Sequence, residues 1–197
     1  MGLGLEREHQ ENTVFTLWGL RRYVNKYLNW GEGPPVKLAG LPSIKLFKYL
    51  DTIPIEAGVY EMGGQWHFML GDFGSFPVMD VPDEANVVVH THPGIRPWGG
   101  QIISYLPSNE DFIHGHTLTS RQFVSSALGI TLFWPVRKWN CKSDELYLAI
   151  YHLKPPTLFL EEQVYLEQLK SYGCQWLVHP WRDIRDQKDL MRVLRED

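Results

Sequence analysis

Two histidines separated by one residue are the first candidates for chemistry in this chain. His90 and His92 follow Val87-Val88-Val89, a β-branched run that predicts a strand. Alternate residues of a strand point to the same face of a sheet, so both imidazoles could bind one metal ion. Pro93 restricts His92 to extended backbone, which supports the strand. The pair alone is also compatible with histidines that are packed in a core or lie on the surface.

Asp111 supplies a third candidate ligand. A catalytic zinc site has three protein ligands and one open position for water, and two histidines with one carboxylate make such a set. Ser108 lies one helical turn before Asp111, so both side chains could face the same pocket. A serine followed three residues later by an acid is also an approximate capping box. A plain helix N-terminus is therefore the alternative interpretation of this pair.

Glu56 is the candidate general acid/base. It leads into an apolar run that predicts a strand. Zinc lowers the pKa of bound water, and a nearby carboxylate can take the proton and deliver it to a leaving amine. Glu61 is the rival base, ranked second because it falls toward the turn predicted at Gly63-Gly64. Without the other residues, Glu56 would be expected to be a solvated carboxylate at the start of a strand.

A second pair of histidines, His114 and His116, has the same spacing as the first. These residues could replace Asp111 and give an all-histidine site. A zinc site with three protein ligands leaves them no required role, so we expect them at the rim of the pocket or in solvent.

Taken in order, these residues resemble the signature of the JAB/MPN (JAMM) metalloprotease family. That signature is a glutamate, a gap, HxHP, a second gap and SxxD. It matches Glu56, His90-Thr91-His92-Pro93 and Ser108-Asn109-Glu110-Asp111. The resemblance covers about residues 53–135. It implies one zinc ion per chain on His90, His92 and Asp111, with Glu56 activating the water and Ser108 steadying the oxyanion.

The resemblance also implies a fold, a reaction and a substrate. The fold would be α/β (α+β), with a curved mixed β-sheet flanked by helices. The reaction would be deubiquitinase-like hydrolysis of peptide or isopeptide bonds. The substrate would be a ubiquitin-like or other protein with an extended tail. A metal-free scaffold that binds partner proteins and a zinc amidase acting on small molecules are the alternative functions.

The chain departs from the family pattern in two places. The gap between His92 and Ser108 is longer than the usual spacing, and the extra residues fall in Ile95–Leu106. Glu56 is followed by Ala57-Gly58, one residue tighter than the common arrangement. Both differences indicate a divergent, bacterial-type member. We expect the loop Ile95–Leu106 to shape the substrate groove, because it joins the two metal-binding segments and carries Trp98; a tolerated surface insertion is the alternative.

Hydrophobic patterning places these motifs on elements. We expect residues 1–42 to be an N-terminal helical extension, with a helix from Val14 to Leu28 capped by Asn12 or Thr13. Residues 43–197 should form the catalytic domain. Its expected elements are a short element of ambiguous type at 44–50, a hairpin at 59–68, a strand at 87–89, a helix at 108–116, strands at 130–134, 146–152 and 175–178, a helix at 161–170 and a charged C-terminal helix.

Composition narrows the possible partners. The chain has 197 residues, a formal net charge of −4 and no long basic run, which disfavours nucleic acid. No apolar stretch is long enough to span a membrane, and the N-terminus lacks the pattern of a signal peptide, so we expect a cytoplasmic protein. Only two cysteines occur, Cys141 and Cys174, which disfavours a disulfide framework. A partner protein is possible, and the sequence predicts no oligomeric state.

Overall fold

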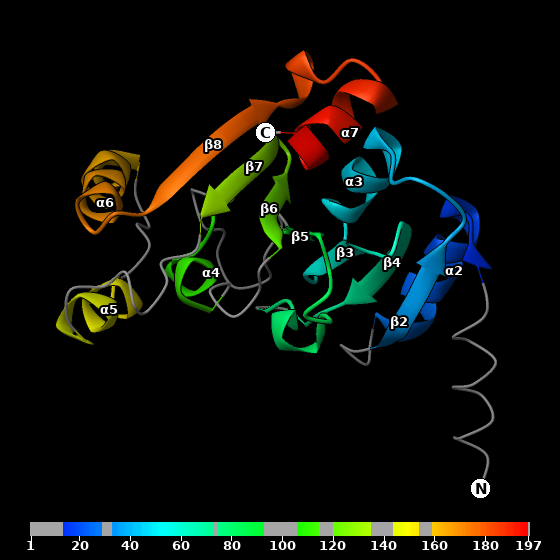
Figure 1. The fold of residues 1–197 in the computed structure, drawn as a ribbon, viewed down its shortest axis with the longest axis horizontal. Helices are drawn as coiled ribbons and strands as arrows, with labels where there is room; N and C mark the ends of the chain where they lie inside the picture. The colour runs from blue at the N-terminus through cyan, green and yellow to red at the C-terminus, as the bar shows by residue number, and fades with distance from the viewer. Residues whose placement is uncertain are drawn as a thin grey trace, which may run out of the picture.

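The computed structural model describes residues 14–28, 33–72, 75–92, 106–114, 120–134, 144–153 and 159–196. They form a mixed α/β structure built on one eight-stranded sheet with helices on its faces (Figure 1). The strands are β1 (Val14–Phe15), β2 (Gly33–Leu38), β3 (Ala57–Met62), β4 (Gln65–Leu70), β5 (Val87–Thr91), β6 (Arg121–Ser126), β7 (Gly129–Trp134) and β8 (Gln175–Pro180). The helices are α2 (Leu17–Tyr27), α3 (Ile44–Leu50), α4 (Asn109–His114), α5 (Asp144–Tyr151), α6 (Phe159–Ser171) and α7 (Gln187–Glu196), with short 3-10 turns η1 (Val78–Asp80) and η4 (Trp181–Asp183).

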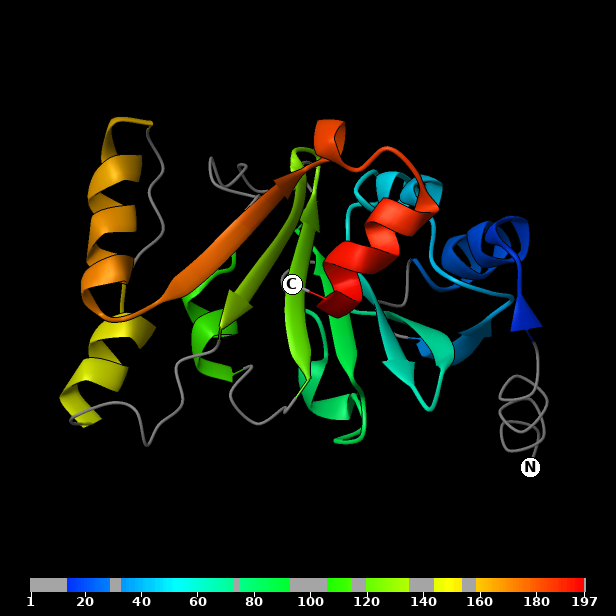
Figure 2. The same cartoon turned by 45° about the horizontal axis from the view of Figure 1, so that its top comes forward.

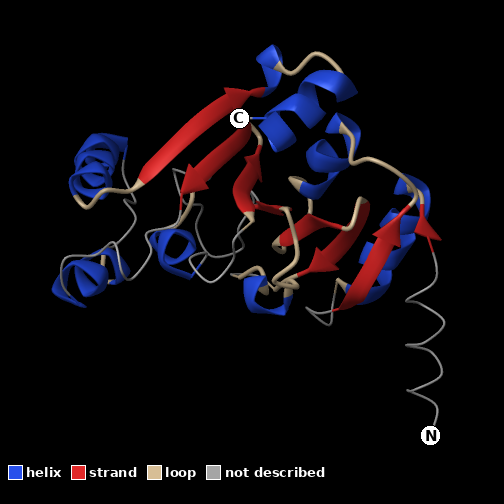
Figure 3. Ribbon diagram, in the orientation of Figure 1, coloured by secondary structure: helices blue, strands red, loops and turns tan. Residues whose placement is uncertain are grey.

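The sheet is mixed, and its strand order is β1-β2-β4-β3-β5-β6-β7-β8 (Figure 3). Strands β5 and β6 are parallel, as are β1 and β2, and the other neighbouring pairs are antiparallel. Parallel strands need a long crossover, and the crossover from β5 to β6 contains α4. This connection brings the start of α4 back toward the end of β5, where the two histidines lie.

The predicted hairpin is confirmed and fixes the register next to the site. Strands β3 and β4 pair from Ala57 opposite Leu70 to Met62 opposite Gln65. Gly63 and Gly64 form the turn with φ angles of 58° and 81°, a left-handed conformation that glycine adopts without steric cost. On the other side of β3, Gly58 lies opposite His90 of β5.

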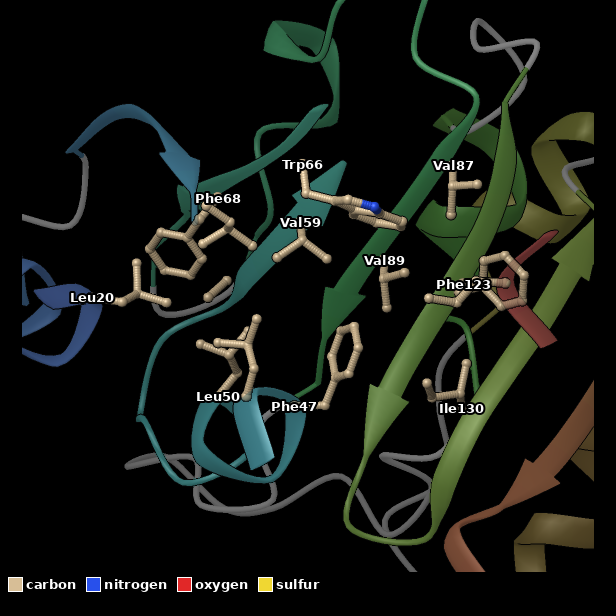
Figure 4. Close-up of a cluster of buried hydrophobic side chains, with 14 of the residues drawn as sticks. Leu20, Phe47, Leu50, Val59, Trp66, Phe68, Val87, Val89, Phe123 and Ile130 are labelled. Carbon is tan, nitrogen blue, oxygen red and sulfur yellow. The ribbon is translucent and has the colours of Figure 1, made fainter. Parts of the chain in front are cut away.

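One face of the sheet carries the largest core cluster. Its side chains include Val59, Val89 and Phe123, which pack against Leu20 of α2 and Phe47 of α3 (Figure 4). Residues Leu190, Val193 and Leu194 of α7 belong to the same cluster. Figures 1 and 2 show α7 lying beside α3.

The opposite face carries two smaller clusters. Phe112 and Ile113 of α4 pack with Val124, Phe133 and side chains of α5 and α6. Tyr60, Phe76, Val88 and their neighbours form a second cluster beneath the segment that leads from β4 to β5. Because Gly58 and His90 alternate with Val59 and Val89, the histidines project into this second face, away from the main core.

The N-terminal part differs from the helical extension expected at 1–42. Val14–Phe15 is a strand, and the helix begins at Leu17 with Thr16 as its N-cap. Strand β2 pairs with β4, and Leu20 belongs to the main core. The described residues of this range are therefore packed as part of the sheet. Strand β2 contains Pro34 and Pro35, and the register of the β2–β4 ladder shifts between Gly33 and Val36, which accommodates residues that lack an N–H.

Other expected elements are confirmed, with one correction and one omission. The strands at 130–134 and 175–178, the helix at 161–170 and the C-terminal helix are present as β7, β8, α6 and α7, and the ambiguous segment at 44–50 is helix α3. The strand expected at 146–152 is wrong, because residues 144–151 form α5. Strand β6 had no counterpart in the sequence analysis. Within the described residues, no helix has both the length and the apolar character needed to cross a bilayer.

Candidate metal centre

Strand β5 brings the two histidines to one face. His90 is in the strand and His92 follows it directly, and the backbone N–H of His92 donates to the carbonyl oxygen of Ser125 in β6 at 3.1 Å. Both side chains are buried, at 4% and 3% exposure. Their Nε2 atoms lie 3.2 Å apart, so the two imidazoles converge on one point as the strand spacing predicts.

Asp111 presents one carboxylate oxygen to each histidine. Its Oδ1 lies 3.2 Å from Nε2 of His90, and its Oδ2 lies 3.1 Å from Nε2 of His92. Ligand atoms that surround zinc tetrahedrally at ordinary bond lengths are separated by about 3.3 Å. The three measured separations are close to that value. The donor set and its spacing therefore fit a small divalent cation.

Hydrogen bonding at His92 strengthens this fit. Nδ1 of His92 lies 2.9 Å from the carbonyl oxygen of Leu106, which can only accept, so Nδ1 carries the proton. In the neutral ring Nε2 is then a bare lone pair, and it faces a carboxylate oxygen at 3.1 Å. Two such acceptors repel each other unless a cation lies between them or His92 is protonated. A metal-binding histidine held by a backbone carbonyl through its other nitrogen is a common outer-sphere arrangement.

His90 is oriented by packing rather than by a hydrogen bond. Its Nδ1 is buried and has no hydrogen-bond partner among the described residues. The ring of Phe76 stacks on the imidazole at 5.6 Å with an interplanar angle of 9°, and Phe133 meets it edge-on at 6.3 Å. Gly58, opposite His90, makes room for Phe76, because a Cβ there would lie 2.6 Å from Cε2 of that ring. This aromatic slot fixes the plane in which His90 presents Nε2.

Asp111 is held by a reciprocal cap at the start of α4. The backbone N–H of Ser108 donates to Oδ2 of Asp111 at 2.7 Å, and the N–H of Asp111 donates to Oγ of Ser108 at 3.1 Å. The Ser108 hydroxyl also donates to Oδ2 at 2.9 Å. The predicted capping box is thus present. In this structure the Ser108 hydroxyl is hydrogen-bonded to Asp111. That this hydroxyl stabilises an oxyanion stays a prediction.

The electrostatics of the site favour an ionised Asp111. Burial by itself raises the pKa of this carboxyl, but the adjacent His90 and His92 outweigh burial and hold the pKa well below its usual range. The side chain of Asp111 is 20% exposed, unlike the two histidines. The centre is therefore closed behind β5 and reaches solvent on the side of α4.

Glu56 lies beside the histidines. One of its carboxylate oxygens and one ring nitrogen of each histidine all lie within 4.8 Å of one another, and this buried group could itself hold a metal ion. The backbone of Glu56 is fixed on both sides, since its N–H donates to Asp72 and its carbonyl accepts from Gly71, each at 2.8 Å. Glu56 is buried, at 4% exposure. It is therefore not the solvated carboxylate that would be expected from its position at the start of a strand alone.

The carboxylate of Glu61 is hydrogen-bonded to groups outside the candidate metal centre. Its Oε1 accepts from the N–H of Gly64 at 2.6 Å, and its Oε2 accepts from the side-chain amide of Asn86 at 2.9 Å. Glu61 is an odd number of residues from Glu56 on the same strand segment, so the two side chains point to opposite faces. Glu61 is buried rather than directed to solvent, and its contacts stabilise the β3–β4 turn.

Several candidates lie outside the described residues. These are His116, Cys141 and the loop from Ile95 to Tyr105, together with the side chain of His114. Cys174 is described and is 2% exposed. The sequence analysis missed the aromatic slot of Gly58, Phe76 and Phe133, since these residues are remote in sequence and match no spacing rule.

Comparisons with known protein families, with curated proteins and with solved structures find no match to this chain.

Proposed function

We propose that this protein is a zinc-dependent hydrolase that cleaves peptide or isopeptide bonds. The observation that carries the proposal is the set of three nearly equal separations among Nε2 of His90, Nε2 of His92 and the Asp111 carboxylate. The tautomer of His92 supports the same conclusion, because it places the lone pair of Nε2 against the Asp111 carboxylate. The fold we propose is of the JAB/MPN type, because Glu56, the histidine strand and the Ser108–Asp111 cap follow one another in that order around one point.

His90, His92 and Asp111 would hold the ion, one per chain. When bound there, zinc supplies a Lewis acid that lowers the pKa of water and polarises a carbonyl. We expect a substrate carbonyl to approach from the side of Asp111, which is 20% exposed while the two histidines are buried. Glu56 also has an oxygen near both histidines. We assign it to proton transfer because the Asp111 oxygens are already within 3.2 Å of both nitrogens.

Glu56 would act as the proton carrier. A buried carboxylate within one water of the histidine nitrogens can accept the proton of an attacking water and then deliver it to the departing amine. Its fixed backbone keeps this oxygen in place during both transfers. Direct attack by water needs no covalent intermediate. The described cysteine, Cys174, is buried in the same cluster as Phe112 and Phe133, at 2% exposure, and is poorly placed as a nucleophile.

We propose an extended protein tail as the substrate, as in a ubiquitin-like protein joined to an amine. The support is the order of motifs, Glu56, His90-Thr91-His92-Pro93 and Ser108–Asp111. A small-molecule amidase and a metal-free scaffold are the competing outcomes of the test.

The test uses the full chain purified with zinc. It is incubated with fusions that join ubiquitin-like proteins to a reporter through their C-terminal tails, and with small amides. We expect cleavage at the tail that a chelator stops and that added zinc restores. Cleavage of small amides alone would indicate the amidase. Zinc binding without cleavage of either substrate would refute hydrolysis, and failure to bind zinc would indicate the scaffold.

A further inference from the structure

Helices α2 and α3 present a group of cations that form no ion pair with the described residues. Arg21, Arg22 and Lys26 are exposed on α2, and Lys45 and Lys48 are exposed on α3. A spacing of four residues puts Arg22 and Lys26 on one face of α2, and a spacing of three residues puts Lys45 and Lys48 on one face of α3. The guanidinium of Arg21 lies 5.0 Å from the ring centre of Tyr49, which joins the two helices into one surface. We call these five residues the cationic patch.

The charge of the patch is unbalanced locally. Residues 14–28 and 33–50 contain six basic side chains and no acidic one, although the whole chain has 23 acidic and 19 basic residues. Ion pairs elsewhere join Arg182, Arg185 and Arg192 to aspartates. Within the described ranges, no member of the patch has a carboxylate within 4.0 Å. The surface therefore offers a positive potential to a partner.

Aromatic rings hold several of these cations in place. Arg22 lies 3.9 Å from the ring centre of Trp18, which is 64% exposed, and Lys26 lies 5.0 Å from that of Tyr27. Cation–π contact restricts a long side chain before any ligand arrives. A preorganised guanidinium loses less entropy when it pairs with a carboxylate.

We propose that the cationic patch binds a short acidic peptide segment of a partner protein. From Trp18 to Lys26 the helix rises roughly 12 Å, which matches about four residues of an extended chain. Arginine pairs well with single carboxylates in bidentate geometry. The sheet separates the patch from the metal centre, since α2 and α3 pack on the face opposite to His90. Partner binding and substrate binding are therefore compatible.

Two other polyanionic partners fit less well. Single-stranded nucleic acid needs open aromatic faces for base stacking, and here cations already lie over the rings of Trp18, Tyr27 and Tyr49. A long nucleic-acid strand would also extend beyond the patch, and the rest of the protein carries a negative net charge. A bilayer needs several apolar groups to insert, but Leu20, Tyr23 and Val24 of α2 are buried in the core, and the exposed ring of Trp18 carries the guanidinium of Arg22 on its face.

The test measures fluorescence anisotropy of a labelled peptide of alternating glutamate and serine with the full chain. The matched variants are Arg21→Gln/Lys48→Gln in the patch and Arg182→Gln/Lys188→Gln on the surface near α7. We expect the peptide to bind the wild type and the control variant alike and the patch variant at least about tenfold more weakly. A peptide with glutamine in place of glutamate should not bind, and the glutamate peptide should shift the Trp18 indole N–H resonance.

Three outcomes would overturn the proposal. Equal affinity of the patch and control variants would place binding elsewhere. No binding of the acidic peptide would mean that the patch is a solvated surface. Tighter, patch-dependent binding of a single-stranded oligonucleotide or of vesicles containing phosphatidylserine would replace the acidic peptide with that partner. All these readouts are independent of zinc and of catalysis.

Discussion

At the scale of residues, the two histidines of one motif are positioned by different forces. His92 is held by a hydrogen bond from Nδ1 to the carbonyl of Leu106, and His90 is held by the rings of Phe76 and Phe133. Strand alternation was sufficient to predict that His90 and His92 share a face. It could not predict Phe76, because the packing of a ring against His90 depends on the path of the segment between β4 and β5.

Glu56→Gln should retain zinc and lose turnover. The amide keeps the size of the side chain but cannot carry the proton, and general acid–base catalysis is worth about 10²–10⁴ in rate. Zinc content and kcat on a cleavable fusion are measured together. Glu61→Gln is the matched control, which we expect to lower stability through the β3–β4 turn while keeping activity. Near-normal turnover by Glu56→Gln with an inactive Glu61→Gln would assign the base to Glu61.

Gly58→Ala should weaken metal binding by about 10–100-fold, as for other changes around metal ligands. The new Cβ would lie 2.6 Å from the Phe76 ring and 2.7 Å from the carbonyl oxygen of Val89, so the ring must leave His90. Competition with a zinc-sensitive dye gives the affinity. Gly40→Ala is the control, because nothing lies within 4 Å of its Cβ position. Equal affinities of the two variants would show that the slot does not orient His90.

At the scale of elements, the strength of local signals decided which parts of the fold could be predicted. The β3–β4 hairpin and the cap of α4 have strong signals, Gly63-Gly64 and Ser108–Asp111, and both are present. Strand β6 lacks one, because Gln122 and Ser125 are polar yet fully buried. The side-chain amide of Gln122 donates to the hydroxyl of Ser120, and the hydroxyl of Ser125 donates to Asp51, a partner that only the folded chain supplies.

Helix α5 shows that a local pattern can also mislead. Its sequence is a short apolar run, which patterning alone cannot assign to helix or strand. The packing of Ile150 with the side chains of α4 and α6 decides the outcome. Tertiary contacts therefore override a local preference that sequence reasoning took to be β.

The junction of α3 and β6 predicts a pH-dependent contribution to stability. Burial raises the pKa of Asp51 from 3.8 to about 7, although the hydrogen bond with Ser125 opposes the rise. The folded state thus binds a proton more tightly than the unfolded state. This contribution is fully present below about pH 4 and is lost as the pH rises through about 7.

Asp51→Asn should remove that dependence. Urea unfolding across this pH range should show the variant gaining stability relative to the wild type as the pH rises, because the neutral amide avoids a buried charge. The exposed Asp83→Asn variant corrects for the change of net charge and should show no such trend. A constant difference between Asp51→Asn and the wild type at all pH values would mean that the pKa of Asp51 is the same in the folded and the unfolded state.

At the scale of the whole molecule, the proposed ion would join separate elements. It would join β5 to α4, which are separated by the undescribed residues 93–105, and would lie beside Glu56 at the start of β3. Binding to the folded state alone stabilises it by mass action. Saturating zinc should therefore raise Tm, a chelator should reverse the rise, and His92→Ala should abolish it. A Tm that does not respond to zinc would show that these elements are held without an ion.

The zinc stoichiometry of the wild type beside Asp111→Asn is the most direct test of the central claim. Both proteins are purified with zinc, freed of loosely bound metal by gel filtration and analysed by mass spectrometry for metals. The account predicts one zinc per wild-type chain, less as the pH falls because the imidazoles must be neutral to bind, and a large loss of zinc in Asp111→Asn. A wild-type chain without a transition metal, or equal zinc in both proteins, would contradict the assignment of His90, His92 and Asp111 as ligands.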